Sequence, residues 1–162
     1  MRVVLDTNAI IFLNDFRNFD EIFTVPEVIQ EIKDKKTSMK LSGMTVKTRE
    51  PDAESIQSVR KMASETGDLG KLSETDIKIL ALANEKKLVI VSDEYNIQNV
   101  AEKIGLDYVS VFNKKIKKLV IWRSYCEYCK KFYDDQVRCS RCGSELIRKR
   151  ESNITLRPEK LK

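Results

Sequence analysis

Four cysteines in one short segment constrain the fold of this chain more than any other feature. They form the pattern C-x2-C-x9-C-x2-C, at Cys126, Cys129, Cys139 and Cys142. Each C-x-x-C pair can bend its backbone into a tight turn that points two thiolates at one ion, and two such turns complete a tetrahedral Zn²⁺ site. Such a site has no open position for water, so we expect one structural zinc ion, Zn²⁺, that folds a small module over residues 121–150. Redox-active or disulfide-bonded cysteines and an iron centre are the alternatives.

The chain before the cysteines alternates apolar runs with helical patterns. Strands are predicted at residues 2–5, 22–25, 88–91 and 108–111, with a weaker strand at 44–48. Helices are predicted between them, at residues 7–14, 26–34, 52–65, 73–86 and 95–104. Residues 35–43 are polar and basic, so we expect an exposed loop there. Strands that alternate with helices predict βαβ units, and therefore an α/β fold with a parallel sheet flanked by helices.

Charge divides the chain in two. Residues 113–162 hold 15 lysines and arginines against 6 acidic residues, whereas residues 1–112 hold 15 against 19. We therefore expect a domain at 1–112, a basic linker at 113–120, the cysteine module at 121–150 and a tail at 151–162. The basic end is expected to bind a polyanion, and nucleic acid fits better than a membrane because no apolar face accompanies the charge.

The binding residues of that basic end are expected around the cysteines. Aromatic side chains can stack on bases while cations meet phosphates, although a module of this size also needs aromatics for its own core. The candidates for RNA contact are Arg123, Tyr128, Lys130, Lys131, Tyr133, Arg138 and Arg141.

The chain contains no histidine. This excludes nucleases with a histidine base, serine or cysteine hydrolases of the triad type, and a histidine-bound catalytic zinc. No apolar run approaches the roughly 20 residues of a membrane span, and no signal-peptide pattern follows Met1. We expect a cytoplasmic protein whose hydrolytic chemistry, if any, uses carboxylates with metals, or lysine.

Four carboxylates come from separate elements that a parallel sheet could bring together. Asp6 and Asp93 follow predicted strands, at the edge where α/β sheets bind ligands. Glu31 and Asp76 lie on predicted helices. Crowded carboxylates repel unless a cation neutralises them, and an all-oxygen cluster suits Mg²⁺ or Mn²⁺. Each acid also has a plain interpretation: Asp6 and Asp93 can cap helices, Asp76 completes a capping pattern with Ser73, and Glu31 can be an ordinary solvated residue.

Several motifs give these residues a wider context. "VVLDTNAII", "VPEVIQEI", "LSETDIKILALA" and "VIVSDEYNIQNVA" follow one another over residues 1 to about 110. In this order they resemble the PIN domain, a family of metal-dependent RNases. A PIN domain followed by a four-cysteine zinc ribbon is similar to the archaeal members of the Nob family. Those endoribonucleases make the last cut at the 3′ end of small-subunit ribosomal RNA.

The resemblance implies roles for particular residues. Asp6, Glu31, Asp76 and Asp93 would be the metal-binding carboxylates, supported by Thr7, Asn8, Ser92 and Glu94. Relatives often have Thr-Asp-Asp where this chain has Ser92-Asp93-Glu94, and we expect Asp93 rather than Glu94 to reach the metal. The family also implies cleavage to 3′-hydroxyl and 5′-phosphate ends, with the ribbon gripping ribosomal RNA on the precursor of the small subunit.

Three other interpretations remain open. One is a toxin-like PIN enzyme that cuts another RNA, although such toxins usually lack a ribbon. Another is a non-catalytic, RNA-binding assembly factor, against which the four acids argue. The third is a DNA-directed role, such as that of a transcription-associated zinc ribbon.

Overall fold

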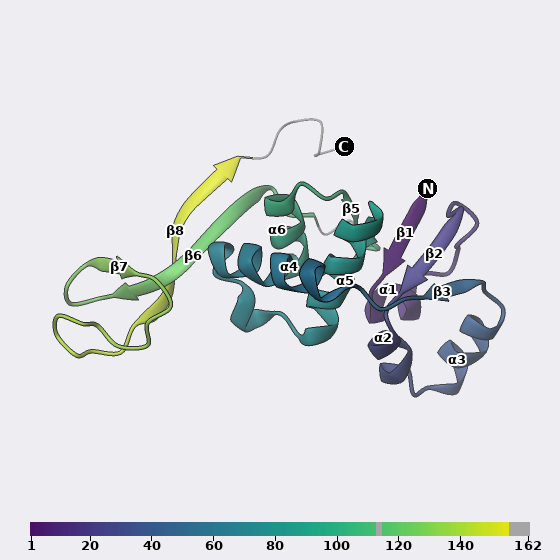
Figure 1. Ribbon diagram of the computed structural model, residues 1–162, viewed down its shortest axis with the longest axis horizontal. Coiled ribbons are helices and arrows are strands. Elements are labelled where there is room, and N and C mark those ends of the chain that lie inside the picture. The colour runs from purple at the N-terminus through teal and green to yellow at the C-terminus, as the bar shows by residue number, and fades with distance from the viewer. Residues whose placement is uncertain (113–114, 156–162) are drawn as a thin grey trace.

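The computed structural model describes residues 1–112 and 115–155, and it confirms the α/β prediction (Figure 1). Five parallel strands form one sheet in the order β3-β2-β1-β4-β5. The two central strands are almost wholly apolar, as expected for a sheet that is covered on both faces. These five strands are β1 (Arg2–Leu5), β2 (Glu21–Thr24), β3 (Val46–Thr48), β4 (Val89–Val91) and β5 (Tyr108–Val109).

Helices connect these strands and complete the core. Helix α5 packs on β1 and β4, and α4 packs on α5 and α6. Leu5, Leu80 and Ile90 are fully buried where these layers meet. No helix within the described residues is both long and apolar enough to cross a membrane. The helices are α1 (Thr7–Phe12), α2 (Pro26–Glu31), α3 (Lys35–Ser42), α4 (Ala53–Thr66), the short 3₁₀ helix η1 (Leu69–Lys71), α5 (Glu74–Lys86) and α6 (Tyr95–Ile104).

Helix α3 occupies the segment for which we predicted a loop, so that prediction was wrong. The Asp34 side chain caps it by accepting a hydrogen bond from the Thr37 amide at 2.8 Å. Lys40 ties it to α1, because its Nζ donates to the carbonyl oxygens of Ile10 and Ile11 at 2.7 and 3.1 Å. Polar contacts and a cap hold this helix, so an apolar period in the sequence could not reveal it.

The C-terminal part forms a second, antiparallel sheet in the order β7-β6-β8. Its strands are β6 (Lys118–Cys126), β7 (Lys131–Tyr133) and β8 (Ile147–Thr155). Strands β6 and β8 pair from Tyr125 with Ile147 to Lys118 with Thr155, and together they form an arm that leaves the helical layers (Figure 1). The ladder thus includes residues 118–120 of the expected linker and 151–155 of the expected tail. Residues 113–114 and 156–162 lie outside the described residues.

A buried polar cluster joins this arm to the helices. Asp68 is fully buried and accepts hydrogen bonds from Arg148 of β8 and from Asn99 of α6, both at 2.6 Å. Asn99 also binds the backbone of β6, donating to the Val120 carbonyl and accepting from the Val120 amide, both at 2.8 Å. We call these residues, Asp68, Asn99, Val120 and Arg148, the junction cluster.

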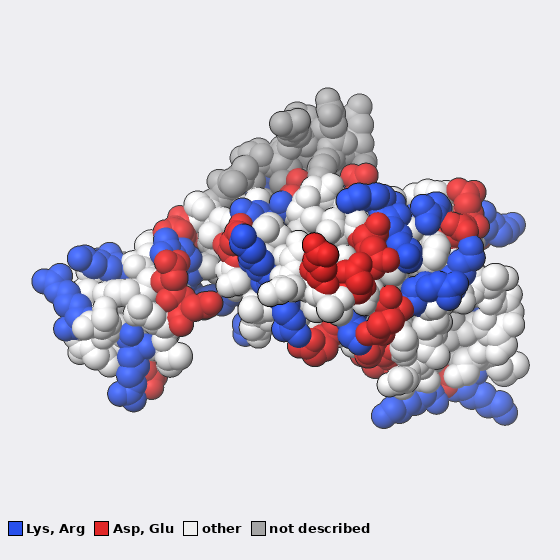
Figure 2. Space-filling model, viewed as in Figure 1, with Lys and Arg blue, Asp and Glu red and all other residues white. Residues whose placement is uncertain are grey.

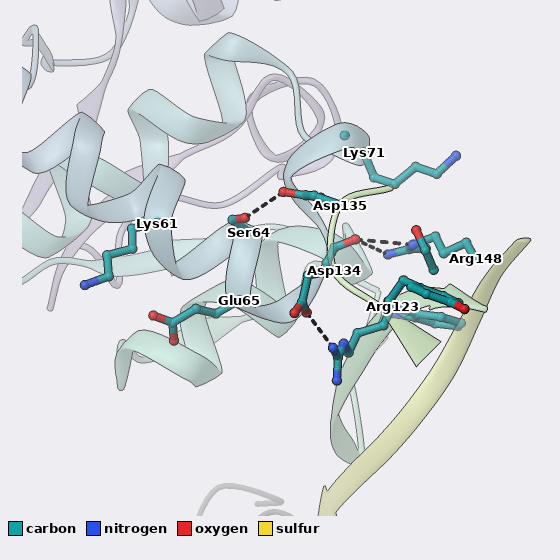
Figure 3. A pocket seen from close by; sticks show the side chains of 13 residues that line it. Lys61, Ser64, Glu65, Lys71, Arg123, Asp134, Asp135 and Arg148 are labelled. Atoms are coloured by element: carbon teal, nitrogen blue, oxygen red, sulfur yellow. Dashed lines mark hydrogen bonds and ion pairs between the residues drawn. The ribbon is translucent and has the colours of Figure 1, made fainter. Parts of the chain in front are cut away.

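The backbone approaches closely at the same place. Gly67 ends α4 with a φ of +73°, and a Cβ there would overlap the carbonyl oxygen of Trp122 in β6. Beside it, a pocket of about 510 Å³ lies between α4 and the arm (Figure 3). Across this pocket the Ser64 hydroxyl lies 3.3 Å from the carboxylate of Asp135. The arm is therefore fixed on the helices by packing as well as by charge.

Candidate active site

An acidic pocket of about 300 Å³ opens beside the carboxyl ends of β1 and β4. The chain builds it from the end of β1, the start of α1, the end of α2, the start of α5 and the loop after β4. A ligand site is expected at this edge of a parallel sheet. The residues that line the pocket are Asp6, Thr7, Asn8, Glu31, Ser73, Thr75, Asp76, Ile79 and Glu94.

Asp6 is the most deeply buried of the pocket acids. Its Oδ1 accepts a hydrogen bond from the Ala9 amide at 2.5 Å and so caps α1, whereas its Oδ2 is buried with no hydrogen-bond partner within the described residues. Burial raises the pKa of Asp6 to about 6, and the charges of Glu94 and Asp76 add to that rise. The Ser92 hydroxyl and the Ala9 amide lower the pKa of Asp6, but by less than burial raises it. A cation bound at Oδ2 would remove this penalty.

Glu31 is oriented by two hydroxyl groups. Thr7 of α1 donates to its Oε2 at 2.5 Å, and Thr75 of α5 donates to its Oε1 at 2.8 Å. Three separate elements thereby meet at one carboxylate. Thr7 was expected to support the site, but Thr75 was missed. Its signal in the sequence was its place next to Asp76 in the first turn of α5.

Asp76 caps its helix and also lines the pocket. Its Oδ2 accepts from the Ser73 amide at 2.8 Å, while its own amide donates to the Ser73 hydroxyl at 3.1 Å. This is the capping box that the sequence suggested. The cap uses Oδ2, so Oδ1 is left for a ligand in the pocket. The two interpretations of Asp76 are therefore compatible.

Glu94, and not Asp93, reaches the acidic pocket. Asp93 Oδ1 accepts from the hydroxyl of Ser110 and, at 3.2 Å, from the amide of Phe112, which places it on the β5 side. Glu94 lines the pocket, and its pKa is raised by burial and by the charge of Asp76. The Ser92 hydroxyl accepts a hydrogen bond from the Glu94 amide at 3.1 Å.

The pocket's chemistry suits a hard divalent cation. Its charged donors are carboxylates only, the Oδ2 of Asp6 is buried without a partner among the described residues, and the pKa of Glu94 is raised by burial and, to a smaller extent, by the charge of Asp76. These oxygens are spread around the pocket. Within the described part of the chain, the group of three or more potential metal ligands whose atoms all lie within 4.8 Å of one another is the cysteine cluster.

The four thiols meet at the far end of the arm. Cys126 Sγ lies 3.5 Å from Cys142 Sγ, and Cys139 Sγ lies 3.8 Å from Cys129 Sγ. The Tyr133 hydroxyl lies 3.1 Å from Cys139 Sγ and lowers the pKa of that thiol, which favours the thiolate that a metal binds. This cluster fits a zinc ribbon.

The candidate RNA-binding residues of the ribbon differ in their availability. Lys130, Lys131, Arg138 and Arg141 are exposed, and Tyr128 is 81% exposed. Figure 2 shows basic side chains gathered at this end of the arm. Arg123 instead forms ion pairs with Asp134 and Glu151, both at 2.7 Å. Tyr133 is half-buried against Cys139, so it belongs to the core of the module.

Comparison with known proteins places both parts in context. Residues 3–85 match the family described as "PIN domain of ribonuclease". Over 156 residues the chain is 36% identical to "Endoribonuclease Nob1" of Archaeoglobus fulgidus, covering 93% of this chain and 92% of that protein. It is 37% identical to "Ribonuclease VapC1" of Thermoplasma acidophilum, covering 95% and 82% of the two chains. It is also 39% identical over 100 residues to "20S-pre-rRNA D-site endonuclease nob1" of Schizosaccharomyces pombe, covering 59% of this chain and 26% of that protein.

Proposed function

Since this chain belongs to the Nob1 family of PIN-domain endoribonucleases, we propose that it matures the 3′ end of small-subunit ribosomal RNA. The pre-rRNA nuclease of Schizosaccharomyces pombe supports this class of substrate. One observation carries the chemistry: carboxylates from four separate elements converge on one pocket in a chain without histidine. The precursor of the small ribosomal subunit would be its partner.

The divalent cation, Mn²⁺ or Mg²⁺, would be held by Asp6, Glu31, Asp76 and Glu94. When bound, it would supply an activated water and neutralise charge on the phosphodiester, giving 3′-hydroxyl and 5′-phosphate ends. Thr7 and Thr75 would fix the Glu31 carboxylate, which limits the rearrangement needed on binding. Asp93 is left out of this ligand set because it does not line the acidic pocket, and its Oδ1 bonds to Ser110 and Phe112 instead.

The ribbon would hold the RNA while the pocket cuts it. One Zn²⁺ bound by the four cysteines would fold the ribbon, and Tyr128, Lys130, Lys131, Arg138 and Arg141 would contact RNA. The basic arm and the acidic N-terminal part carry opposite net charges, which supports this division of labour.

The test is cleavage of an RNA that spans the small-subunit 3′ end, with Mn²⁺, with Mg²⁺ or with neither. We expect cutting at one position that needs the cation, is absent for a scrambled RNA and is lost in Asp6→Asn. Tight binding by the wild type with no cutting under any of these conditions would contradict the proposal and favour the assembly-factor interpretation.

A second candidate is cleavage of a different RNA, which the similarity to the VapC1 ribonuclease favours. Transfer and messenger RNA fragments in the same assay separate the two. Faster cation-dependent cutting of those fragments than of the ribosomal RNA would support this second function.

A further inference from the structure

An exposed face of α1 leads away from the acidic pocket. Thr7 and Asn8 line the pocket, and Ile11 and Phe12 follow one turn later on the same face of the helix. Ala9 and Ile10 are buried on the other side. Phe12 is 50% exposed, although an aromatic side chain usually gains most from burial. At about 1.5 Å per residue, it lies only about 7–8 Å along the axis from Thr7.

A second exposed ring lies against Phe12. The ring of Phe112, which is 52% exposed, has its centroid 5.4 Å from that of Phe12, with the planes at 61°. Asp93 fixes this segment, because its Oδ1 accepts the hydrogen bond of the Phe112 amide. The residue after Asp93 is the pocket acid Glu94, so one short loop positions both the pocket and the ring. We call Phe12 and Phe112 the aromatic pair.

Positive charge lies beside the aromatic pair. A hollow of about 540 Å³ is bordered by Phe12 and Ile11 and by Lys36 and Lys40 of α3. Lys40 uses its Nζ on neutral carbonyl oxygens, and among the described residues neither lysine forms an ion pair. Asp34, the acid at this hollow, is occupied in capping α3. Figure 2 shows basic side chains over the α3 end of the molecule.

We propose that the aromatic pair stacks an unpaired nucleobase of the substrate next to the scissile bond, while Lys36 faces the adjoining phosphate and Lys40 adds positive charge beside it. This deepens the proposed function and rests on it. An acidic pocket repels the RNA backbone, so attraction must come from neighbouring groups. Aromatic faces stack any unpaired base, and cations complete such single-strand sites. A surface that binds substrate must adjoin the acidic pocket, as this face does, whereas a surface that binds a protein partner need not.

Fluorescence tests the stacking without requiring cleavage. Single-stranded RNAs would carry 2-aminopurine at successive positions, and the full-length protein would carry Asp6→Asn to prevent cutting. We expect quenching at one position, loss of that quenching with Phe12→Ala or Phe112→Ala, and its retention with Phe12→Tyr. Met39→Ala is the matched control, because Met39 is a large apolar residue on α3, 67% exposed, that does not border the hollow.

Cleavage kinetics then tie the stacking to one nucleotide. With an otherwise wild-type chain, Phe12→Ala should lower kcat/KM roughly 5- to 150-fold on intact RNA, in keeping with the stacking of one base. An abasic site at the quenched position should cost the wild type a similar factor and cost Phe12→Ala little more. Met39→Ala should behave as wild type in both assays.

The outcomes separate this inference from the function on which it rests. Quenching that persists in both alanine variants would show that the aromatic pair does not stack the base, whichever RNA is cut. Quenching that depends on the pair without any cleavage of ribosomal RNA keeps the base site and rejects the substrate. If Phe12→Ala leaves quenching intact but changes the sedimentation of the protein, the surface joins two copies of the chain and the proposal is wrong.

Discussion

At the residue scale, Asp6 combines a cap with a buried charge. Its side chain accepts a hydrogen bond from the Ala9 amide and so caps α1. Asparagine caps the start of a helix equally well. Its pKa, raised by burial to about 6 from 3.8, means that ionised Asp6 destabilises the folded protein without a bound cation. In buffer without Mg²⁺ or Mn²⁺ at pH 7.5, Asp6→Asn should therefore be more stable than wild type by about 3 kcal/mol.

The stability gained by Asp6→Asn should depend on pH. Because the folded pKa lies above the unfolded value, the penalty is absent below about pH 4, grows as the pH rises and is complete above about pH 6. Urea unfolding at pH 4 and at pH 7.5 measures the difference. An equal gain at both values would mean that it does not come from the buried charge.

The exchange of Asp93 for Glu94 as a proposed ligand leads to a second prediction. Glu94→Gln should lower kcat/KM with Mn²⁺ by at least about 100-fold, because it removes a charged ligand. Asp93→Asn should have a smaller effect, since Asp93 bonds to Ser110 and Phe112 rather than facing the pocket. The reverse order of the two variants in a Mn²⁺ titration of cleavage would restore Asp93 to the ligand set.

The sequence could not decide between these two acids. Asp93 and Glu94 are adjacent after β4, and which of them enters the pocket depends on how this loop turns, with the Glu94 amide bonded to the Ser92 hydroxyl. Asp6 could be placed from sequence because it directly follows the apolar strand β1. Glu31 and Thr75 could not be paired from sequence, because their contact depends on how α2 and α5 pack.

At the element scale, the end of α4 shows what a single Cβ would cost. Gly67→Ala meets both the left-handed backbone and the Trp122 carbonyl oxygen, whereas Gly105→Ala at the end of α6 meets the same kind of backbone and open space. We expect Gly105→Ala to lower the free energy of unfolding by about 1 kcal/mol. Gly67→Ala should lower it by at least about 1 kcal/mol more. Thermal unfolding of the pair measures this. Equal losses would mean that β6 can move away from α4 freely.

Elements were predictable where apolar residues defined them. The apolar runs that make up β4 and most of β1, and the capped, periodic α5, were found from sequence alone. Helix α3 was missed because Asp34 and Lys40, rather than an apolar face, hold it in place. The length of β8 was missed for a related reason: it begins "IRKRES", with no alternation between apolar and polar residues.

At the scale of the whole molecule, the folding of the ribbon should depend on its four-cysteine cluster, whereas that of the parallel sheet should not. Cys129→Ser removes one thiol from the four-cysteine cluster, so we expect the ribbon to unfold and RNA binding to fall while the parallel sheet stays folded. Circular dichroism, zinc content and RNA affinity together check this. Ser140→Ala, which removes an exposed hydroxyl within the second C-x-x-C turn, is the control. Wild-type RNA affinity in Cys129→Ser would contradict the division of labour between ribbon and pocket.

The junction cluster has a consequence for how a cut site could be chosen. Asp68 is fully buried and accepts from Asn99 of α6 and Arg148 of β8, while Asn99 also binds β6, so the arm cannot swing without leaving the Asp68 charge unpaired. The base of the arm is thus held in one position on the helices. If the ribbon grips RNA as proposed, the bond that is cut would be set by its distance from the gripped segment. The enzyme would then need no sequence-specific contacts to the nucleotides between the two.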